Sequence, residues 1–151
     1  MRPIWIIGAG GHAKVVIDTL RTLGTFDVLG VLDDDPLRLG TEVLRVPVRG
    51  EASHESIDRF GIAEAIIAIG SNRARAAVAR RLADRLSWAT AIHPTAHLAP
   101  GVRIGEGTVV FAGAIVQPSS VIGHHVILNT ACSVDHDGSI GDFVHIAPGV
   151  R

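Results

Sequence analysis

Isoleucine, valine or leucine recurs with a fixed period of six through the second part of the chain. It occupies ten successive positions of one register: Ile92, Leu98, Ile104, Val110, Val116, Ile122, Leu128, Val134, Ile140 and Ile146. Such a period predicts a parallel β-helix, in which each hexapeptide supplies one short strand and one corner, and three hexapeptides close a triangular coil. Glycine follows the aliphatic residue at Gly105, Gly123 and Gly141, where we expect corners that use its tolerance of positive φ.

Counted from Leu98, the repeat gives three complete coils, and the last of them ends at Arg151. The open end of a β-helix exposes unpaired backbone groups and apolar core unless a cap, a neighbour or further sequence covers it. We therefore expect this β-helix, residues 91–151, to be truncated or to depend on oligomerisation.

Residues 1–87 alternate predicted strands with predicted helices. Strands are expected over residues 4–7, 28–32 and 63–69, helices up to residue 23 and over 73–86, and a short strand or an extended loop over 43–48. This alternation indicates a small Rossmann-like α/β lobe of about three parallel strands, whose ligands bind beyond the carboxyl ends of the strands. The expected fold class is therefore an α/β lobe followed by an all-β parallel β-helix.

The second predicted helix has its own signals. Ser71 or Asn72 is expected to be its N-cap, because short polar side chains can accept a hydrogen bond from the first turn. Its arginines are expected to form a solvent-facing side: Arg73, Arg75, Arg80, Arg81 and Arg85.

A glycine-rich loop joins the first predicted strand to the first helix. Residues 8–13, GAGGHA, fit the G-x-G-x-x-G/A pattern, and Asp33 follows twenty positions after Ala13. Glycines let backbone N–H groups approach a phosphate at the positive end of a helix, and a carboxylate after the second strand can bind hydroxyl groups. The pattern predicts nucleotide binding, and a turn that merely needs glycine is the alternative. The small lobe favours one nucleotide over a dinucleotide.

Two further groups border this loop. His12 lies at the entrance of the helix, where an imidazole could contact a phosphate or a sugar, or could simply be solvated. Asp33, Asp34 and Asp35 form a short acidic run that is either a ligand contact or a solvated turn.

His136 lies between Asp135 and Asp137 in the third predicted coil. Transfer of an acyl group to an amine or a hydroxyl needs a base with a near-neutral pKa, and a neighbouring carboxylate orients an imidazole and raises its basicity. His136 with Asp137 is therefore a candidate catalytic pair, and a solvated corner is the alternative. His145 follows nine residues later, which is half a coil, so the two histidines cannot be stacked vertically.

The composition of the chain argues against nucleic-acid binding and against metal binding. With 14 basic and 15 acidic residues the chain is nearly neutral and shows no basic stripe of a nucleic-acid-binding protein. Eight histidines occur without the H-x-H or C-x-x-C spacing of a metal site, so no metal is expected. His124 and His125 are expected to face solvent at a corner.

The single cysteine and the short apolar segments indicate where in the cell the protein is located. Cys132 excludes an intrachain disulfide and is expected to pack in the core of the repeat. No segment has the length of a signal peptide's apolar region or of a membrane span. These features predict a cytoplasmic protein without a membrane partner.

Five segments follow one another along the chain: GAGGHAK, LDDD, AIGSN, IHPTA and LNTACSVDHDGSIGDFVHIAPG. With them the whole chain resembles the NeuD/PglD-like sugar O- and N-acetyltransferases. The resemblance implies a left-handed β-helix, a homotrimer and acetyl-CoA as cosubstrate. It also implies a first lobe that binds a nucleotide-linked amino sugar, commonly a UDP-4-amino-4,6-dideoxy sugar, in the biosynthesis of glycans.

The resemblance assigns roles to individual residues. His136 matches the general base of the family, and Asp137 matches its acidic partner. Asn129 matches a residue near the sugar, and His145 matches one near acetyl-CoA. The nucleotide contacts of the family fall on the following residues: Gly10, Gly11, His12, Asp33, Asp34, Gly70 and Asn72.

The leading functional hypothesis is acetyl transfer from acetyl-CoA to the amino group of a nucleotide-linked sugar. O-acetylation of sialic acid or another free sugar is an alternative, in which the first lobe need not bind a nucleotide. A truncated, non-catalytic module that binds a nucleotide and trimerises is a second alternative. A nicotinamide-dependent oxidoreductase fits less well, because the repeat offers no machinery for hydride transfer.

Overall fold

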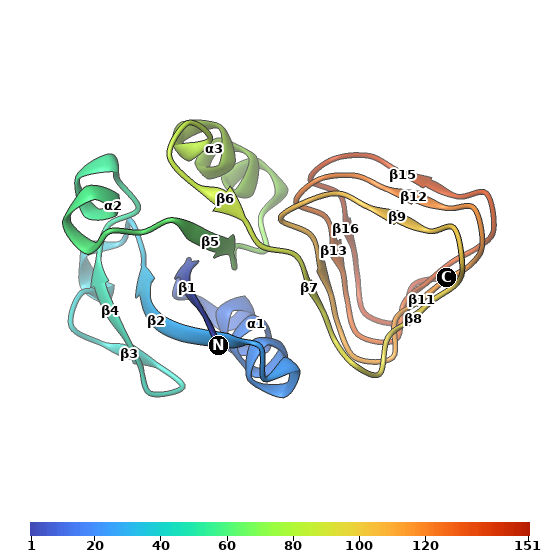
Figure 1. Ribbon diagram of the computed structural model, residues 1–151, viewed down its shortest axis with the longest axis horizontal. Helices are drawn as coiled ribbons and strands as arrows, with labels where there is room; N and C mark the ends of the chain where they lie inside the picture. The colour runs from blue at the N-terminus through green and yellow to red at the C-terminus, as the bar shows by residue number, and fades with distance from the viewer. The chain divides into compact units, whose positions relative to one another are not determined.

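Two units make up the chain in the computed structural model, which describes residues 1–151. The first unit covers Met1–Ala89 and the second covers Thr90–Arg151. In Figure 1 the helices and a twisted sheet belong to the first unit, and the second unit is a stack of triangular coils.

A six-stranded sheet forms the centre of the first unit, in the order β3-β4-β2-β1-β5-β6. Its strands are β1 (Arg2–Ile7), β2 (Phe26–Leu32), β3 (Glu42–Val43), β4 (Val46–Gly50), β5 (Glu64–Ile67) and β6 (Ser87–Trp88). All neighbours are parallel except β3 and β4. The expected number of about three strands is too low. Residues 43–48 belong to a hairpin, and β6 is too short to show a periodic pattern.

Three helices connect these strands: α1 (Gly11–Leu23), α2 (His54–Phe60) and α3 (Asn72–Leu82), with a 3₁₀ helix η1 (Pro36–Arg38) after β2. The apolar residues that α1 buries share one face of the helix: Ala13, Val16, Ile17 and Leu20. Helix α2 was not predicted. Its seven residues bury only Ser56 and Ile57, so they give no amphipathic pattern to recognise.

Helix α3 begins after Ser71, whose hydroxyl accepts a hydrogen bond from the Ala74 N–H at 3.4 Å. Ser71 is therefore the N-cap, one of the two residues expected. The prediction that the arginines of this helix face solvent is wrong for Arg75, which is 1% exposed. Its guanidinium donates to the carbonyls of Ile69 and Gly70 at 2.8 and 3.1 Å. Burial lowers the pKa of Arg75 to about 10, which keeps it protonated at neutral pH.

The second unit is a left-handed parallel β-helix of ten short strands. They are β7 (Ala91–Ile92), β8 (His97–Leu98), β9 (Arg103–Ile104), β10 (Val109–Val110), β11 (Ile115–Val116), β12 (Val121–Ile122), β13 (Ile127–Leu128), β14 (Ser133–Val134), β15 (Ser139–Ile140) and β16 (His145–Ile146). They form three parallel sheets, one for each face of the triangle (Figure 1). Paired residues in successive coils are eighteen positions apart, as Val110 is from Ile92 and from Leu128. The repeated aliphatic side chains fill the interior.

From Gly101 to Gly149, every sixth residue lies at a corner and has a positive φ, between 53° and 83°. The position is held by Gly101, Gly107, Gly113, Ser119, His125, Ala131, Asp137, Phe143 and Gly149. The glycines that follow the aliphatic residues do not share this conformation, so the reason expected for Gly105, Gly123 and Gly141 is wrong. At Gly105 and Gly123 glycine is required because a side chain would clash with the next coil. A Cβ on Gly105 would lie 2.5 Å from the carbonyl carbon of Gly123 in the next coil.

His125 illustrates the effect of the corner conformation. It is 5% exposed, and its ring stacks on Phe143 of the next coil with centroids 5.2 Å apart, so the prediction that it faces solvent is wrong. The other side of the ring lies over Gly107, where a Cβ would overlap it. Cys132 packs in the core as expected, at 1% exposure, and burial raises the pKa of its thiol.

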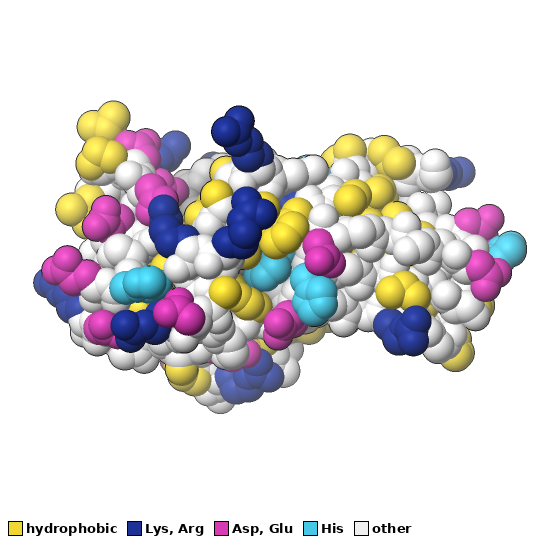
Figure 2. All heavy atoms as spheres, turned by 90° about the horizontal axis from the view of Figure 1, so that it is seen from above, with side chains coloured by type: hydrophobic (Ala, Val, Ile, Leu, Met, Phe, Trp, Pro, Cys, Tyr) yellow, Lys and Arg dark blue, Asp and Glu magenta, His cyan; other side chains and the backbone are white.

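On the face drawn in Figure 2, basic and acidic side chains are interspersed rather than separated by sign. No helix of the structure combines the length and the apolar character that crossing a membrane requires.

Candidate functional site

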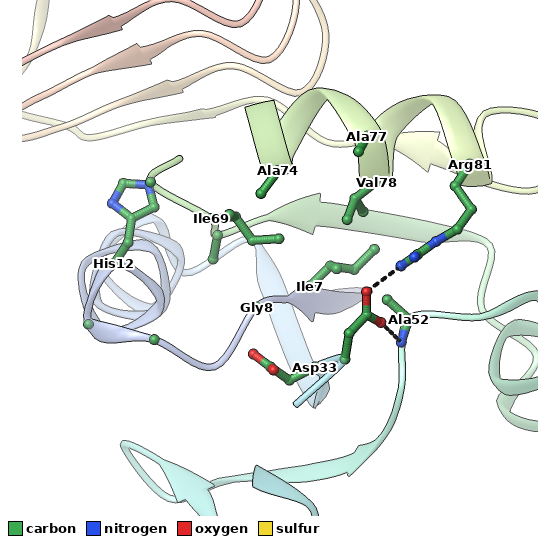
Figure 3. Close-up of a pocket in the computed structure, with 15 residues that line it drawn as sticks. Ile7, Gly8, His12, Asp33, Ala52, Ile69, Ala74, Ala77, Val78 and Arg81 are labelled. Carbon is green, nitrogen blue, oxygen red and sulfur yellow. Dashed lines mark hydrogen bonds and ion pairs between the residues drawn. The ribbon is translucent and has the colours of Figure 1, made fainter. Parts of the chain in front are cut away.

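A pocket of about 640 Å³ opens at the carboxyl ends of β1, β2 and β5. It is lined by Ile7, Gly8, Gly10, Gly11, His12, Asp33, Asp34, Ala52, Ala68, Ile69, Gly70, Ala74, Ala77, Val78 and Arg81. Because these strands are parallel, the loops that follow them meet at one edge of the sheet. Figure 3 shows the opening between this edge and helix α3, with Ala74 and Val78 directed from the helix toward the strand ends.

The glycine loop after β1 combines a steric requirement with open space. Gly8 has φ of +109°, and a Cβ there would lie 2.7 Å from the Ile69 side chain and 2.9 Å from the Ala68 carbonyl oxygen. Only glycine fits this position. Gly10 is the N-cap of α1 and makes no side-chain cap, and a Cβ on Gly10 or Gly11 would meet nothing within 4 Å. The first-turn N–H groups of α1 therefore border the pocket, where an anion would be stabilised.

The Asp33 carboxylate joins two of the loops around the pocket. Its Oδ2 accepts a hydrogen bond from the Ala9 N–H at 2.5 Å, and its Oδ1 accepts one from the Asp35 N–H at 2.8 Å. From its sequence position Asp33 is expected either to contact a ligand or to lie in a solvated turn. The structure adds a third role, because this side chain fixes the glycine loop against the end of β2.

Asp34 forms a second bridge, between two other residues that line the pocket. Its Oδ1 accepts from the Ala52 N–H at 3.0 Å, and its Oδ2 pairs with the Arg81 guanidinium at 2.7 Å. Arg81 was predicted to lie on the solvent face, and its side chain is 46% exposed, but it also lines the pocket (Figure 3). The helical spacing of Ala74, Val78 and Arg81, at i, i+4 and i+7, is the signal that could have found it.

The remaining residues expected at the nucleotide site divide into two groups. His12 and Gly70 line the same pocket as Gly10, Gly11, Asp33 and Asp34. Asn72 does not line it. Its side-chain oxygen accepts a hydrogen bond from Arg75 at 2.9 Å, so Asn72 helps to hold the guanidinium that supports the turn after β5.

His136 and Asp137 are joined directly in the second unit. The Nδ1 atom of His136 lies 2.7 Å from Oδ2 of Asp137, and the two side chains are 70% and 74% exposed. Neighbouring residues on a strand point to opposite sides. The corner removes this obstacle, because Asp137 has φ of 56°. Asp135 completes the arrangement by accepting a hydrogen bond from the His136 N–H at 2.8 Å.

This environment raises the pKa of His136 above its ordinary value of 6.5. The largest cause is the hydrogen bond to Asp137, followed by the negative charges of Asp135 and Asp137. In the neutral ring the Nδ1–H donates to the carboxylate, so the lone pair lies on Nε2. The pair can therefore accept a proton through Nε2.

Replacing Asp137 by asparagine tests this cause. Asparagine adopts positive φ readily, so the corner is expected to keep its conformation. We expect Asp137→Asn to lower the pKa of His136 toward 6.5, and Asp135→Asn to lower it by less, because Asp137 supplies the largest contribution. Titration of the His136 ring by NMR measures both shifts. An unchanged His136 pKa in Asp137→Asn would contradict the assigned cause.

Asn129 and His145 form a second polar contact in the β-helix. The Thr130 N–H donates to Oδ1 of Asn129 at 2.8 Å, which fixes the orientation of the amide. Its Nδ2 then donates to Nε2 of His145 at 3.0 Å. Neutral His145 consequently carries its proton on Nδ1. In the structure no three His, Cys, Asp or Glu side chains come together as a metal-binding group.

Comparison with known proteins identifies a family and several relatives of this chain. The PglD N-terminal domain family matches residues 3–82. UDP-N-acetylbacillosamine N-acetyltransferase of Bacillus subtilis (strain 168) is 35% identical over 115 residues, which are 74% of this chain and 52% of that protein. The chain thus spans about half the length of this relative.

Two solved structures are similar to both units. A mutant of perosamine N-acetyltransferase from Caulobacter crescentus, in complex with CoA and GDP-perosamine, matches with a TM-score of 0.89 and 41% identity, over 98% of this chain and 70% of that one. The acetyltransferase domain of PglB from Neisseria gonorrhoeae, in complex with acetyl coenzyme A, matches with a TM-score of 0.86 and 38% identity. This match covers 98% of this chain and 71% of that one. Since the family match covers more than half of the chain and the structural matches nearly all of it, the chain belongs to the NeuD/PglD-like family of sugar acetyltransferases.

Proposed function

We propose that this protein transfers an acetyl group from acetyl-CoA to the amino group of a nucleotide-linked sugar in glycan biosynthesis. The observation that carries the proposal is the His136–Asp137 pair, a hydrogen-bonded imidazole and carboxylate at an exposed corner. The Bacillus and Caulobacter relatives are N-acetyltransferases, and the Caulobacter and Neisseria structures hold CoA or acetyl coenzyme A.

In the proposed reaction acetyl-CoA supplies an acetyl group activated as a thioester. Nε2 of His136 accepts a proton from the sugar amine while the amine nitrogen forms its bond to the acetyl carbon. The carbon–sulfur bond breaks, CoA leaves as its thiolate, and the thiolate takes the proton from the imidazolium. Asp137 keeps the ring oriented and, together with Asp135, stabilises the imidazolium that results. A general base works unprotonated, so the raised pKa of His136 places the acid limb of the rate above pH 6.5.

Asn129 and His145 have proposed roles near the sugar and near acetyl-CoA, as the family resemblance implies. Their mutual hydrogen bond supports a joint role, because it fixes both the Asn129 amide and the His145 tautomer. Two oriented polar side chains of this kind suit the binding of a substrate with several hydroxyl or amide groups.

The pocket of the first unit supports the nucleotide part of the proposal. Gly10 and Gly11 leave space beside the N–H groups of α1 that suits a diphosphate, and His12, Asp33, Asp34 and Gly70 complete the polar lining. We propose Asn72 as an indirect contributor that acts through Arg75. A UDP-4-amino sugar is the first candidate substrate, and the GDP sugar of the Caulobacter complex makes GDP the second.

Calorimetric titration with UDP, GDP and acetyl-CoA, each separately, tests this function. Binding of one nucleotide and of acetyl-CoA supports it. If neither nucleotide binds, O-acetylation of a free sugar becomes the better hypothesis. If a nucleotide binds and acetyl-CoA does not, a non-catalytic nucleotide-binding module becomes the better one.

Gly10→Val tests the position of the nucleotide. The φ of Gly10 is −78°, which valine also adopts, and the added side chain would occupy the open space beside the first turn of α1. We expect nucleotide affinity to fall at least tenfold, roughly 1.4 kcal/mol, with little change in stability. Gly141→Ala, also into open space but in the β-helix, is the matched control. Equal nucleotide affinity in the two variants would place the nucleotide elsewhere.

We further propose a homotrimer and a cytoplasmic location. The high exposure of His136 and Asp137 in one copy supports a site that other copies help to enclose, since a general base works best where water is excluded. Light scattering distinguishes a trimer from the 15.9 kDa monomer. Cys132 is the single cysteine of the chain, and this sparse use of cysteine agrees with a reducing compartment.

A further inference from the structure

Ser120 lies under the turn that carries the His136–Asp137 pair. Its side chain is fully buried. Its Oγ donates to the carbonyl oxygen of Asp135 at 2.9 Å and accepts from the N–H of Gly138 at 3.2 Å. Positions 135 and 138 are the two ends of the turn, so one hydroxyl from the preceding coil joins both ends.

The backbone of this turn sets the geometry of the pair. The side chains of His136 and Asp137 are 70% and 74% exposed, so packing by neighbours constrains them little. Within the turn, the hydrogen bond from the Gly138 N–H to the Asp135 carbonyl is long, at 3.3 Å. From the preceding coil, the Pro118 carbonyl accepts the N–H of Asp137 at 3.0 Å. The Gly138 carbonyl also accepts a hydrogen bond from the Val121 N–H at 2.8 Å. Ser120 adds contacts to the Asp135 carbonyl and to the Gly138 N–H, which the backbone of the preceding coil does not reach.

The β-helix does not need a hydroxyl at this position in every coil. Ala114, Val126 and Cys132 fill the equivalent position, four residues after the repeated aliphatic, and all are at most 1% exposed. Thr108 repeats the arrangement under another turn. Its Oγ1 donates to the Gly123 carbonyl at 2.8 Å and accepts from the Val126 N–H at 3.0 Å. Thr108 therefore serves as an internal reference for what such a hydroxyl contributes to stability alone.

The geometry points to Ser120 as a positioning residue for acetyl transfer, which holds the 135–138 turn so that Asp137 stays within hydrogen-bonding distance of His136. Ser120 acts through the backbone of the turn and not on the reacting groups. Its role in catalysis rests on the proposed function, whereas its effect on the pair can be measured without any substrate.

Three variants separate positioning from stability. Ser120→Ala removes the hydroxyl, Ser120→Thr retains it, and Thr108→Val removes the matching hydroxyl under a turn without the pair. We expect Ser120→Ala and Thr108→Val to lower the Tm by similar amounts. Only Ser120→Ala should lower the His136 pKa in an NMR titration, and it should reduce kcat by about tenfold to a hundredfold. Ser120→Thr should retain both values. Asp135 and Asp137 remain in every variant, so the shift reports geometry and not lost charge.

The outcomes are distinguishable. An unchanged His136 pKa in Ser120→Ala, or an equal shift in Thr108→Val, would overturn the positioning role. Should Ser120→Ala fail to fold, Ser120→Cys replaces it, because Cys132 fills the equivalent buried position two hexapeptides later. A smaller pKa shift in the same direction is then expected, since a thiol is a weak donor, and no shift would overturn the role. A pKa shift without acetyl transfer by the unaltered protein would sink the proposed function and retain the positioning role.

Discussion

Gly105→Ala is expected to destabilise the β-helix by about 3 kcal/mol, the upper end of the usual cost of overpacking. The added Cβ would lie 2.5 Å from the carbonyl carbon of Gly123, 2.6 Å from its oxygen and 2.7 Å from the His124 nitrogen. All three are backbone atoms of the next coil, so no side chain can rotate away. The coils would have to separate locally, with loss of the interstrand hydrogen bonds beside the corner.

The equivalent glycine two coils on provides the control. A Cβ on Gly141 would meet nothing within 4 Å, and its φ is not positive. We expect Gly141→Ala to change stability by less than about 0.5 kcal/mol. Thermal and urea unfolding of the two variants, followed by circular dichroism, measure the difference. Similar stability of Gly105→Ala and Gly141→Ala would show that the coils yield more easily than their spacing indicates.

His136→Ala is expected to lower kcat for acetyl transfer by roughly 10²–10⁴, the usual contribution of a general base. The variant removes Nε2, the atom proposed to accept the proton of the sugar amine. Nucleotide affinity should change little, because the pocket proposed to bind the nucleotide is built from residues of the first unit. The ring is exposed, so little apolar packing is lost and the fold should be retained.

Steady-state kinetics with acetyl-CoA and an amino-sugar nucleotide, combined with calorimetry, separate catalysis from binding. His124→Ala is the matched control, since His124 is also an exposed histidine at a corner of the β-helix. It should retain full activity. If His136→Ala keeps the kcat of the unaltered protein, the proposed general base is wrong.

The sequence predicts the β-helix well because its six-residue period corresponds directly to the repeating unit of the fold. One aliphatic side chain enters the interior at each hexapeptide, and the strands lie where these residues stand. The prediction that Gly105 is needed for a positive φ is nevertheless wrong. Its constraint comes from a backbone segment eighteen residues away, and the residue itself has an ordinary φ. The backbone conformation that a residue type favours is a property of that residue alone. It carries no information about an atom of the next coil that lies close to it.

In the first unit, prediction failed where elements are short or where a polar residue is buried. Helix α2 and strand β6 have too few residues for a period to emerge. Arg75 looks like a surface residue by type, and only the carbonyls of the turn after β5 explain its burial. Asp33 was predicted at the correct edge of the sheet, but its hydrogen bonds to the glycine loop depend on tertiary placement.

The His136–Asp137 pair shows how far a sequence argument can go. Adjacency in sequence left open whether the side chains touch, because the corner conformation was not assigned to a position. A count of six from Gly101, Gly107 and Gly113 reaches Asp137, so the positive φ there was accessible from the sequence. The contribution of Ser120 was not, since it depends on a hydroxyl facing two ends of a turn in the following coil.

The eighteen-residue register also limits how the length of the second unit can vary. Each layer of the prism repeats the backbone of the layer beneath it, at the spacing of neighbouring strands, about 4.8 Å. Adding or removing a whole layer below Ser120 would shift the His136–Asp137 pair along the prism axis and leave its own contacts intact. Adding a single residue would move every later side chain out of line with the residue eighteen positions before it. Length in this unit is therefore tolerated in whole layers, and the chemistry at a corner can be moved along the axis as a module.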